Sequence, residues 1–380
     1  QMAKKRGPNE GTISKRADGR WMARLNLGVV DGKRKRKYFY GDTRKEVAEQ
    51  LAAALRDLQY GLPVAVERQT VGQFLSHWLE TSVKPSRSYN THKSYAKLAR
   101  LYLVPHLGHL QLQKLAPQHV QTMMNAMGAA GLSPRTIAYA RAVLRRALNQ
   151  AIKWELVTKN AAALTDPPAA RQREVHPFTP EQARAFLDAV SGHRQKALYT
   201  VALAIGLRQG EALGLRWEDL DLDTGQLHVR KQIQRIDSKL QLVDVKTAKS
   251  RRTIPLPAIA IIALRAHRTR QLEERLLAGQ RWQDRGLVFP TMVGTPQDGN
   301  NTRVLFQRLV KRAGLPPQRF HDLRHACASL LLFQGVPARV VMEILGHSNI
   351  GITMNTYSHV MPQAQRDAAN LMDAILSATS

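Results

Sequence analysis

The chain is 380 residues long, which is enough for two or three domains of ordinary size. Lys and Arg number 57 against 29 Asp and Glu, so the formal net charge is +28 and the pI is near 10.8. This charge predicts a polyanionic partner, DNA or RNA. No apolar run reaches about 18 residues and no signal-peptide pattern is present, so we expect an intracellular protein with no membrane partner.

The positive charge is spread along the whole chain. Residues 1–65 hold 15 basic and 7 acidic side chains, residues 66–175 hold 15 and 5, and residues 176–380 hold 27 and 17. A single basic tail would suit many functions. Three basic segments instead favour a long nucleic acid that lies across all of them.

Cys327 is the only cysteine in the sequence. One cysteine excludes an intramolecular disulfide and a zinc site built from cysteines. A lone cysteine can act as a nucleophile, but this one has small apolar neighbours on a predicted helix. We therefore expect Cys327 to be a packing residue.

The first 65 residues predict a small sheet followed by one helix. Residues 1–11 are basic and polar and predict a mobile arm. Asp18-Gly19 and Asp31-Gly32 are strong hairpin-turn signals. They separate three predicted strands: Thr12–Lys15, Trp21–Val29 and Lys35–Tyr40. Thr43 and Glu46 form a capping box that opens a helix through Leu58.

The third predicted strand is mostly cationic. A run of charge is most often a solvated face, but this run lies on a twisted sheet beside aromatic side chains. We therefore favour a sheet that docks on DNA. Its candidate DNA contacts are Trp21, Arg24, Lys35, Lys37 and Tyr38.

Residues 66–165 predict a helical module. Apolar residues recur at helical spacing in four segments: 71–81, 88–103, 117–130 and 133–152. Cations are scattered over these helices, and the candidate DNA contacts among them are Lys93, Lys97, Arg141 and Arg145. The Pro- and Ala-containing segment 166–178 then predicts an exposed linker.

The remainder of the chain, 179–380, mixes helices and short strands. Thr179 begins a capped helix, and Lys196–Ile205 predicts a buried helix. Strands are predicted over Gln226–Ile236, Gln241–Val245 and Arg252–Pro255, and helices fill the rest to about residue 378. The expected fold is multidomain and mainly α, with small β-sheets.

Arg208 follows an apolar helix that ends at Gly206, and Glu211 comes three residues later. The pair can be a surface ion pair worth at most about 1 kcal/mol. It can also be an arginine that Glu211 holds toward a phosphate, because a guanidinium stays charged and binds two oxygens at once. The pair by itself favours neither interpretation.

His321, Arg324 and His325 share one helix face, at spacings i, i+3 and i+4. His-x-x-x-His is also the spacing of a zinc-protease helix. Here Asp322 stands in place of the expected Glu, no third ligand has a recognised spacing, and Arg324 would place a positive charge beside the metal. We therefore expect no metal site.

His347 and Tyr357 are ambiguous when each is taken alone. His347 follows Gly346, which would end the helix Pro337–Leu345, and a histidine in such a turn is most often a structural hydrogen-bonding residue. Tyr357 is most often a packing residue. Its ordinary pKa of about 10 makes it a poor nucleophile unless neighbours help to remove its proton.

Together these residues fit the cleavage of a phosphodiester by a tyrosine without a metal. The transition state spreads negative charge over nonbridging oxygens, which Arg208, Arg324 and His347 can bind. His321 can accept the proton of Tyr357 as a general base.

An acid for the leaving 5′ oxygen is the remaining requirement. Lys246 lies between two predicted strands and has the reach to enter a DNA groove and donate a proton. Lys249, on the same connection, is a second candidate.

The order and spacing of these motifs resemble the tyrosine recombinases, specifically the phage-type integrases. Their pattern is Gly-Leu-Arg-x-x-Glu, a lysine on a β-hairpin, His-x-Leu-Arg-His, Leu-Gly-His and a final tyrosine. Several independent motifs must coincide, so the match is specific over residues 176–380. The matched residues are Arg208, Glu211 (supporting Arg208), Lys246, His321, Arg324, His347 and Tyr357 (the nucleophile).

The resemblance implies three domains. Residues 1–65 resemble the arm-binding domain of the lambda and transposon integrases, and residues 66–165 resemble the SAM-like core-binding domain. The linker 166–178 leads to a mixed α+β catalytic domain, 179–380. The implied function is site-specific DNA recombination that integrates or excises a mobile element through a 3′-phosphotyrosyl intermediate. No cofactor and no metal are implied, because the link conserves bond energy and protein cations replace Mg²⁺.

The resemblance also implies partners. These are double-stranded DNA at core-type and arm-type sites, further copies of the chain in a tetramer on DNA, and accessory DNA-bending or excisionase proteins. The implied location is the bacterial cytoplasm, at the nucleoid. The apolar C-terminal stretch Ala364–Leu376 can dock on a neighbouring protomer or on its own core. A type IB topoisomerase and a non-catalytic DNA-binding regulator remain alternative functions.

Overall fold

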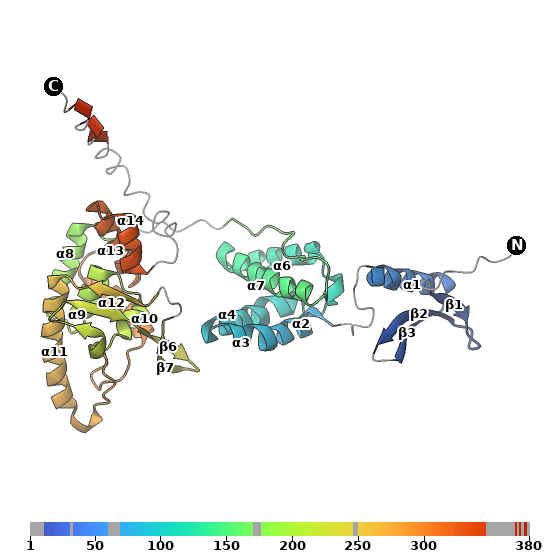
Figure 1. Cartoon of the computed structure of the whole chain (residues 1–380), viewed down its shortest axis with the longest axis horizontal. Helices are drawn as coiled ribbons and strands as arrows, with labels where there is room; N and C mark the ends of the chain where they lie inside the picture. The colour runs from blue at the N-terminus through green and yellow to red at the C-terminus, as the bar shows by residue number, and fades with distance from the viewer. Residues whose placement is uncertain are drawn as a thin grey trace. The chain divides into compact units, whose positions relative to one another are not determined.

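The computed structural model describes residues 11–30, 33–59, 69–169, 176–245 and 250–346, together with short pieces of 369–377. These residues are mainly helical with small antiparallel sheets, which confirms the predicted fold class. The chain forms two compact units, Gln1–Gln172 and Arg173–Ser380 (Figure 1). None of the helices in the described ranges has the length and apolar character needed to cross a membrane.

A small antiparallel sheet and one helix begin the first unit. In the described residues 11–59 the strands run in the order β1 (Thr12–Lys15), β2 (Trp21–Val30) and β3 (Lys33–Gly41). Helix α1 (Arg44–Gln59) packs on this sheet, and Ala23 and Leu25 share a core with its apolar side chains. Thr43 Oγ1 accepts the Glu46 N–H at 3.2 Å, as the capping box predicts.

A helical bundle forms the rest of the first unit. Its apolar side chains, including Phe74, Trp78 and Leu144, are buried together in one core. The first two predicted helices continue further than expected, because a π-helical turn shifts the register of each and carries its apolar face onward. The elements are α2 (Val71–Trp78), η1 (Leu79–Val83), α3 (Lys84–Ser86), α4 (Tyr89–Leu98), η2 (Ala99–Leu103), α5 (Val104–Leu107), η3 (Leu112–Lys114), α6 (Pro117–Ala129) and α7 (Pro134–Lys153).

The second unit is built around α9 (Lys196–Ile205), which is the predicted buried helix. Tyr199 on α9 contacts Phe186, Phe306 and Phe320 at ring-centroid distances of 5.5–6.2 Å. The aromatic cluster joins four segments that are far apart in sequence. The other helices are α8 (Pro180–Ala189), α10 (Gln209–Leu213), η4 (Trp217–Asp219), α11 (Ala258–Ala278), η6 (Gly279–Arg281), α12 (Gly299–Arg312), α13 (Asp322–Phe333) and α14 (Ala338–Leu345).

The strands of the second unit differ from the prediction. The single strand expected over Gln226–Ile236 is two strands, because the chain changes partner at Arg230, whose carbonyl accepts the Val245 N–H at 3.2 Å. β5 (Gln226–Val229) pairs with β8 (Arg252–Pro255), and β4 (Leu220–Asp221) borders β5. β6 (Lys231–Ile236) pairs with β7 (Lys239–Asp244).

The hairpin turn lies in the gap between the strands predicted to end at Ile236 and to begin at Gln241. β6 and β7 are joined at Asp237 and Ser238, which take positive φ of 44° and 65°. Lys246 and Lys249 come between β7 and β8 in the sequence. Both lysines lie outside the described residues.

Cys327 lies in the core, as predicted. It is 2% exposed, and loss of hydration raises the pKa of its thiol to about 12. A thiol in this state stays protonated at neutral pH and is a poor nucleophile. Its sulfur packs near Gly206, at the end of α9.

The turn at Gly206 provides a test of the packing. Gly206 has φ of 64°, and a Cβ there would collide with Leu345 and come within 3.3 Å of the Cys327 sulfur. Gly314 has φ of 68° but no atom within 4 Å of the same position. We expect Gly314→Ala to cost about 1–2 kcal/mol for backbone strain, and Gly206→Ala about 1–3 kcal/mol more for overpacking. Chemical denaturation measures both, and equal losses would contradict the close packing at Gly206.

Candidate active site

The site begins where α9 ends. Gly206 adopts a left-handed conformation that turns the chain, and Arg208 becomes the N-cap residue of the short helix α10. Arg208 Nη1 donates to Glu211 Oε1 at 2.7 Å, and Glu211 Oε2 accepts the Arg208 backbone N–H at 3.1 Å. The Arg208 side chain is still 37% exposed, so its guanidinium is held by a carboxylate while part of it faces solvent.

Glu211 holds a second arginine. Its side chain is 3% exposed, so the Arg208–Glu211 pair differs from an ordinary surface ion pair. Arg252 Nη2, from β8, donates to Glu211 Oε2 at 3.0 Å. Burial by itself would raise the pKa of Glu211, but Arg252 first and Arg208 second outweigh it and hold this pKa below its ordinary value.

Arg252 is a site residue that the sequence analysis missed. A signal for it was present, because residues 252 and 254 of a strand point to the same side. Ile254 is 1% exposed, so an arginine two residues earlier points inward and needs a partner there.

Arg324 joins the same turn from another helix. It lies in the first turn of α13 and is 2% exposed. Its Nη1 donates to the Gly206 carbonyl at 2.7 Å, across 118 positions of sequence. The fold therefore brings the two predicted arginines together. Arg324 is hydrogen-bonded to the turn at Gly206, and Arg208 lies two residues beyond that turn.

Burial lowers the pKa of both histidines at the start of α13 and so favours their neutral forms. His321 and His325 lie with ring centroids 5.2 Å apart and nearly perpendicular. Loss of hydration first, and then His325 and Arg324, lower the pKa of His321 to about 4. Asp322 is bound by Arg319 at 2.7 Å, and among the described residues no group of three His, Cys, Asp or Glu is arranged to hold a metal ion.

The end of α14 closes the described part of the site. Gly346 has φ of 66° and ends this helix, as predicted. Its carbonyl accepts from Arg208 Nη2 at 2.9 Å, and the Ile344 carbonyl accepts from Arg252 Nε at 2.7 Å. The next residue is His347, which lies outside the described residues, as does Tyr357.

The predicted contacts on the N-terminal sheet divide between its two faces. Arg24 and Tyr38 are direct cross-strand neighbours, and both are exposed. Trp21 and Lys37 do not join them: Trp21 packs against the core with α1, and Lys37 lies over the Phe39 ring at 5.6 Å. The side chain of Lys35 lies outside the described part of the chain.

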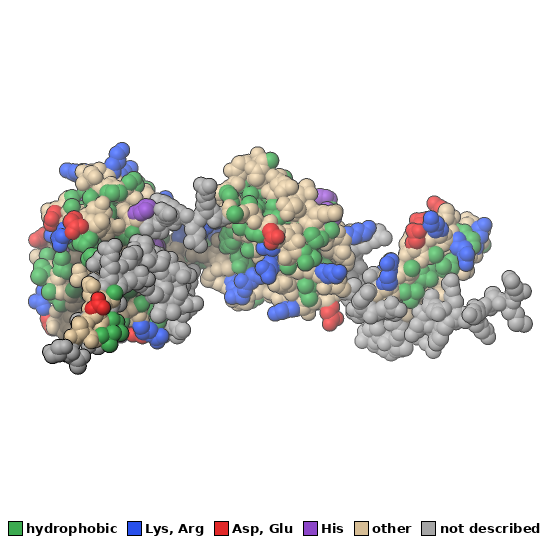
Figure 2. All heavy atoms as spheres, turned by 90° about the horizontal axis from the view of Figure 1, so that it is seen from above, with side chains coloured by type: hydrophobic (Ala, Val, Ile, Leu, Met, Phe, Trp, Pro, Cys, Tyr) green, Lys and Arg blue, Asp and Glu red, His purple; other side chains and the backbone are tan. Residues whose placement is uncertain are grey.

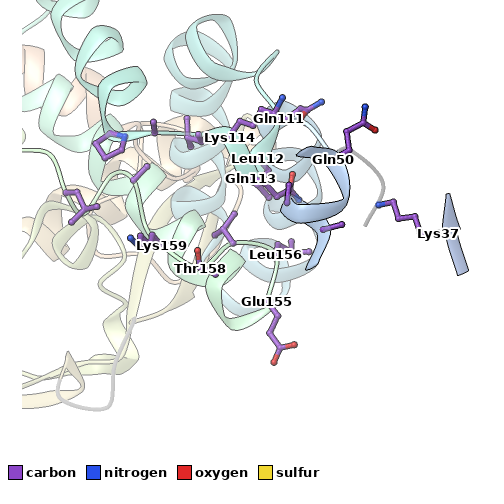
Figure 3. Close-up of a pocket in the computed structure, with 18 of the residues that line it drawn as sticks. Lys37, Gln50, Gln111, Leu112, Gln113, Lys114, Glu155, Leu156, Thr158 and Lys159 are labelled. Carbon is purple, nitrogen blue, oxygen red and sulfur yellow. The ribbon is translucent and has the colours of Figure 1, made fainter. Parts of the chain in front are cut away.

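The helical bundle carries a basic groove. Arg141 and Arg145 line it, together with Tyr139. Lys93 and Lys97 are exposed on α4, so the structure does not bring all four predicted cations together. Figure 2 shows Lys and Arg clearly outnumbering acidic side chains on one face of this part. In Figure 3, Lys114 at the end of η3 and Lys159 in the segment after α7 border a second hollow.

Comparison with known proteins defines the family. The profile of the phage integrase family matches residues 177–364, and that of the phage integrase N-terminal SAM-like domain matches residues 70–128. A tyrosine recombinase XerC-like protein of Caldanaerobacter subterraneus subsp. tengcongensis is 33% identical over 90% of this chain and 93% of its own. An integrase of Streptomyces ambofaciens is 32% identical over 98% of both chains. The chain belongs to the phage integrase family.

Solved structures support the same fold. The Tn1549 transposon integrase in complex with transposon right end DNA is 24% identical, with a TM-score of 0.69 over 82% of this chain and all of that chain. A lambda integrase tetramer bound to a Holliday junction is 18% identical, with a TM-score of 0.57 over 93% and 96% of the two chains. The resemblance drawn from the motifs is confirmed: the protein is an enzyme, a tyrosine recombinase for site-specific recombination of mobile elements.

The low pKa of His321 predicts a pH-dependent stability. The unfolded chain protonates this histidine near pH 6.5, whereas the folded chain does so only near pH 4. Below about pH 6.5 the unfolded state binds more protons, so stability falls as the pH falls toward 4. Between about pH 7 and pH 5, we expect the melting temperature of His321→Gln to fall by less than that of the wild type. Thermal denaturation at the two pH values measures this difference.

Other histidines also make the stability depend on pH. His193, His267 and His325 also have lowered pKa values, so the variant keeps part of the slope. Equal losses in the two proteins would show that His321 titrates normally in the folded state.

Proposed function

We propose that Tyr357 attacks the scissile phosphate while Arg208 and Arg324 bind its nonbridging oxygens. The observation that carries this proposal is the turn at Gly206. Arg324 is hydrogen-bonded to this turn, and Arg208 comes two residues after it in the sequence. A cation held in place before the substrate arrives stabilises the developing charge with little reorganisation. The 3′ phosphate becomes linked to the tyrosine oxygen, and the 5′ oxygen leaves as a hydroxyl.

The proton transfers are assigned to the remaining motif residues. We assign His321 as the acceptor of the tyrosine proton, which its neutral state permits. A bound phosphate would offset the repulsion from Arg324 and raise the pKa of His321 toward a working range. His347 donates to a phosphate oxygen, and Lys246, with Lys249 as the alternative, protonates the leaving oxygen.

The reaction needs no cofactor in this proposal. The phosphotyrosyl link conserves the energy of the broken phosphodiester, so the free 5′-hydroxyl can attack it and rejoin the strand. Arg208 and Arg324 supply the positive charge that a metal ion supplies in other phosphoryl transfers.

The parts of the chain are assigned separate roles on double-stranded DNA. Residues 179–380 form the catalytic domain, residues 66–165 bind core-type sites, and residues 1–65 bind arm-type sites, with 166–178 as the linker. The basic groove of the bundle and the exposed Arg24–Tyr38 pair support these roles. The lambda integrase solved on a Holliday junction is a tetramer, and we propose the same assembly here, with accessory DNA-bending or excisionase proteins.

Replacement of the nucleophile is the direct test. Tyr357→Phe removes the attacking oxygen and leaves the cations unchanged, so we expect DNA affinity to be retained and covalent trapping on a nicked suicide substrate to be abolished. Denaturing gel electrophoresis of labelled DNA measures the adduct. An adduct formed by the phenylalanine variant would overturn the assignment of Tyr357.

The arm-binding role of residues 1–65 predicts that arm-type DNA binding can be separated from core-site cleavage. Deletion of residues 1–65 removes the N-terminal sheet but no proposed catalytic residue. We expect binding to distal arm-type DNA to be lost while weak cleavage of core sites remains, because that sheet is the proposed arm contact. Band-shift titration on the two DNAs measures both affinities. Equal affinity of the truncated and full chains for arm-type DNA would contradict the role.

A further inference from the structure

Arg252 donates hydrogen bonds to three separate segments of the described chain. Its Nε donates to the Ile344 carbonyl at 2.7 Å, its Nη1 to the Ser250 carbonyl at 3.1 Å and its Nη2 to Glu211 Oε2 at 3.0 Å. All three nitrogens of the guanidinium therefore have partners. The side chain is 7% exposed.

Each of these three partners contacts, or is close in sequence to, a different residue with a proposed catalytic role. Glu211 holds Arg208. Ile344 lies three residues before His347, and Ser250 follows the segment that contains Lys246 and Lys249. One buried guanidinium thus joins α10, the end of α14 and the start of β8.

We propose that Arg252 is a positioning residue for DNA cleavage, which sets the place of Arg208 through their shared partner Glu211 and fixes the end of α14. This inference rests on the proposed role of Arg208. The two arginines differ in how their guanidinium groups are used. Arg208 keeps 37% of its side chain exposed, whereas all three guanidinium nitrogens of Arg252 donate to protein acceptors.

The geometry requires an arginine at this position. A guanidinium holds five N–H donors on three nitrogens in one rigid plane, whereas a lysine ammonium is a single charged group on a flexible stem. The stem is also packed, because a Cβ on Gly346 would lie 3.1 Å from both Cδ and Nη1 of Arg252. Arg252→Lys therefore keeps the charge but loses the link between Glu211 and Ile344.

Arg194 provides a matched control in the same unit. It donates to both oxygens of Glu274, at 2.5 and 2.6 Å, and to the Pro290 carbonyl at 3.0 Å. Its side chain is 21% exposed, and its hydrogen-bond partners include none of the proposed catalytic residues that the structure describes. Arg194→Met thus removes a comparable ion pair without touching the site.

The experiment compares Arg252→Met, Arg252→Lys and Arg194→Met in the full chain on a suicide core-site substrate. We expect all three to bind DNA as the wild type does, and both methionine variants to melt at lower temperature. The single-turnover cleavage rate of folded protein should fall about 10- to 100-fold in Arg252→Met, less in Arg252→Lys and not in Arg194→Met. A wild-type rate in both Arg252 variants would overturn the inference.

A second arm tests whether Arg252 acts through Arg208. In an Arg208→Lys background, Arg252→Met should lower the cleavage rate by a much smaller factor than it does in the wild type, because the group that Arg252 positions is already altered. The same fold-loss in both backgrounds would show an independent effect and contradict the positioning role. A wild-type rate for Arg208→Lys and Arg208→Met would instead overturn the proposed function itself.

Discussion

The site depends on one buried carboxylate, that of Glu211. A buried ionised group is costly unless it is paired and hydrogen-bonded, and here Arg208 and Arg252 provide both kinds of interaction. One negative charge between two positive ones leaves an excess positive charge, and the exposed edge of Arg208 presents it to solvent. The arrangement is therefore held in place without a substrate and is incompletely neutralised, which are the two properties that binding of a phosphate needs.

The ends of two helices complete this arrangement. α9 ends at Gly206 and α14 at Gly346, both in the left-handed conformation. Carbonyls in the last turn of a helix have no partner within it and carry partial negative charge, and the one of Ile344 in α14 accepts from Arg252. Arg324 binds the carbonyl of Gly206 and Arg208 that of Gly346. The glycine turns that follow the two helices thus orient the side chains of the site.

The sequence predicted what local chemistry determines. Gly206 and Gly346 were expected to end helices, and a capping box was expected to begin α8, because glycine conformation and capping depend on a few neighbouring residues. Contacts between distant segments were not predictable in this way. The strand expected over Gln226–Ile236 changes partner at Arg230, and Arg252 was overlooked because its partner is 41 positions away. The likeness of the motifs to a known family supplied the function, which no single residue indicated.

In the proposed mechanism, the charge of Glu211 organises the arginines for cleavage. Glu211→Gln keeps the shape and removes the charge, so single-turnover cleavage of a suicide substrate by folded, DNA-saturated protein isolates that effect. A hydrogen bond to a charged group contributes about 1.5–3 kcal/mol, so we predict a rate at least about tenfold lower. A wild-type rate under the same conditions would contradict this role of Glu211, because the arginines would then be placed without the charge of the carboxylate.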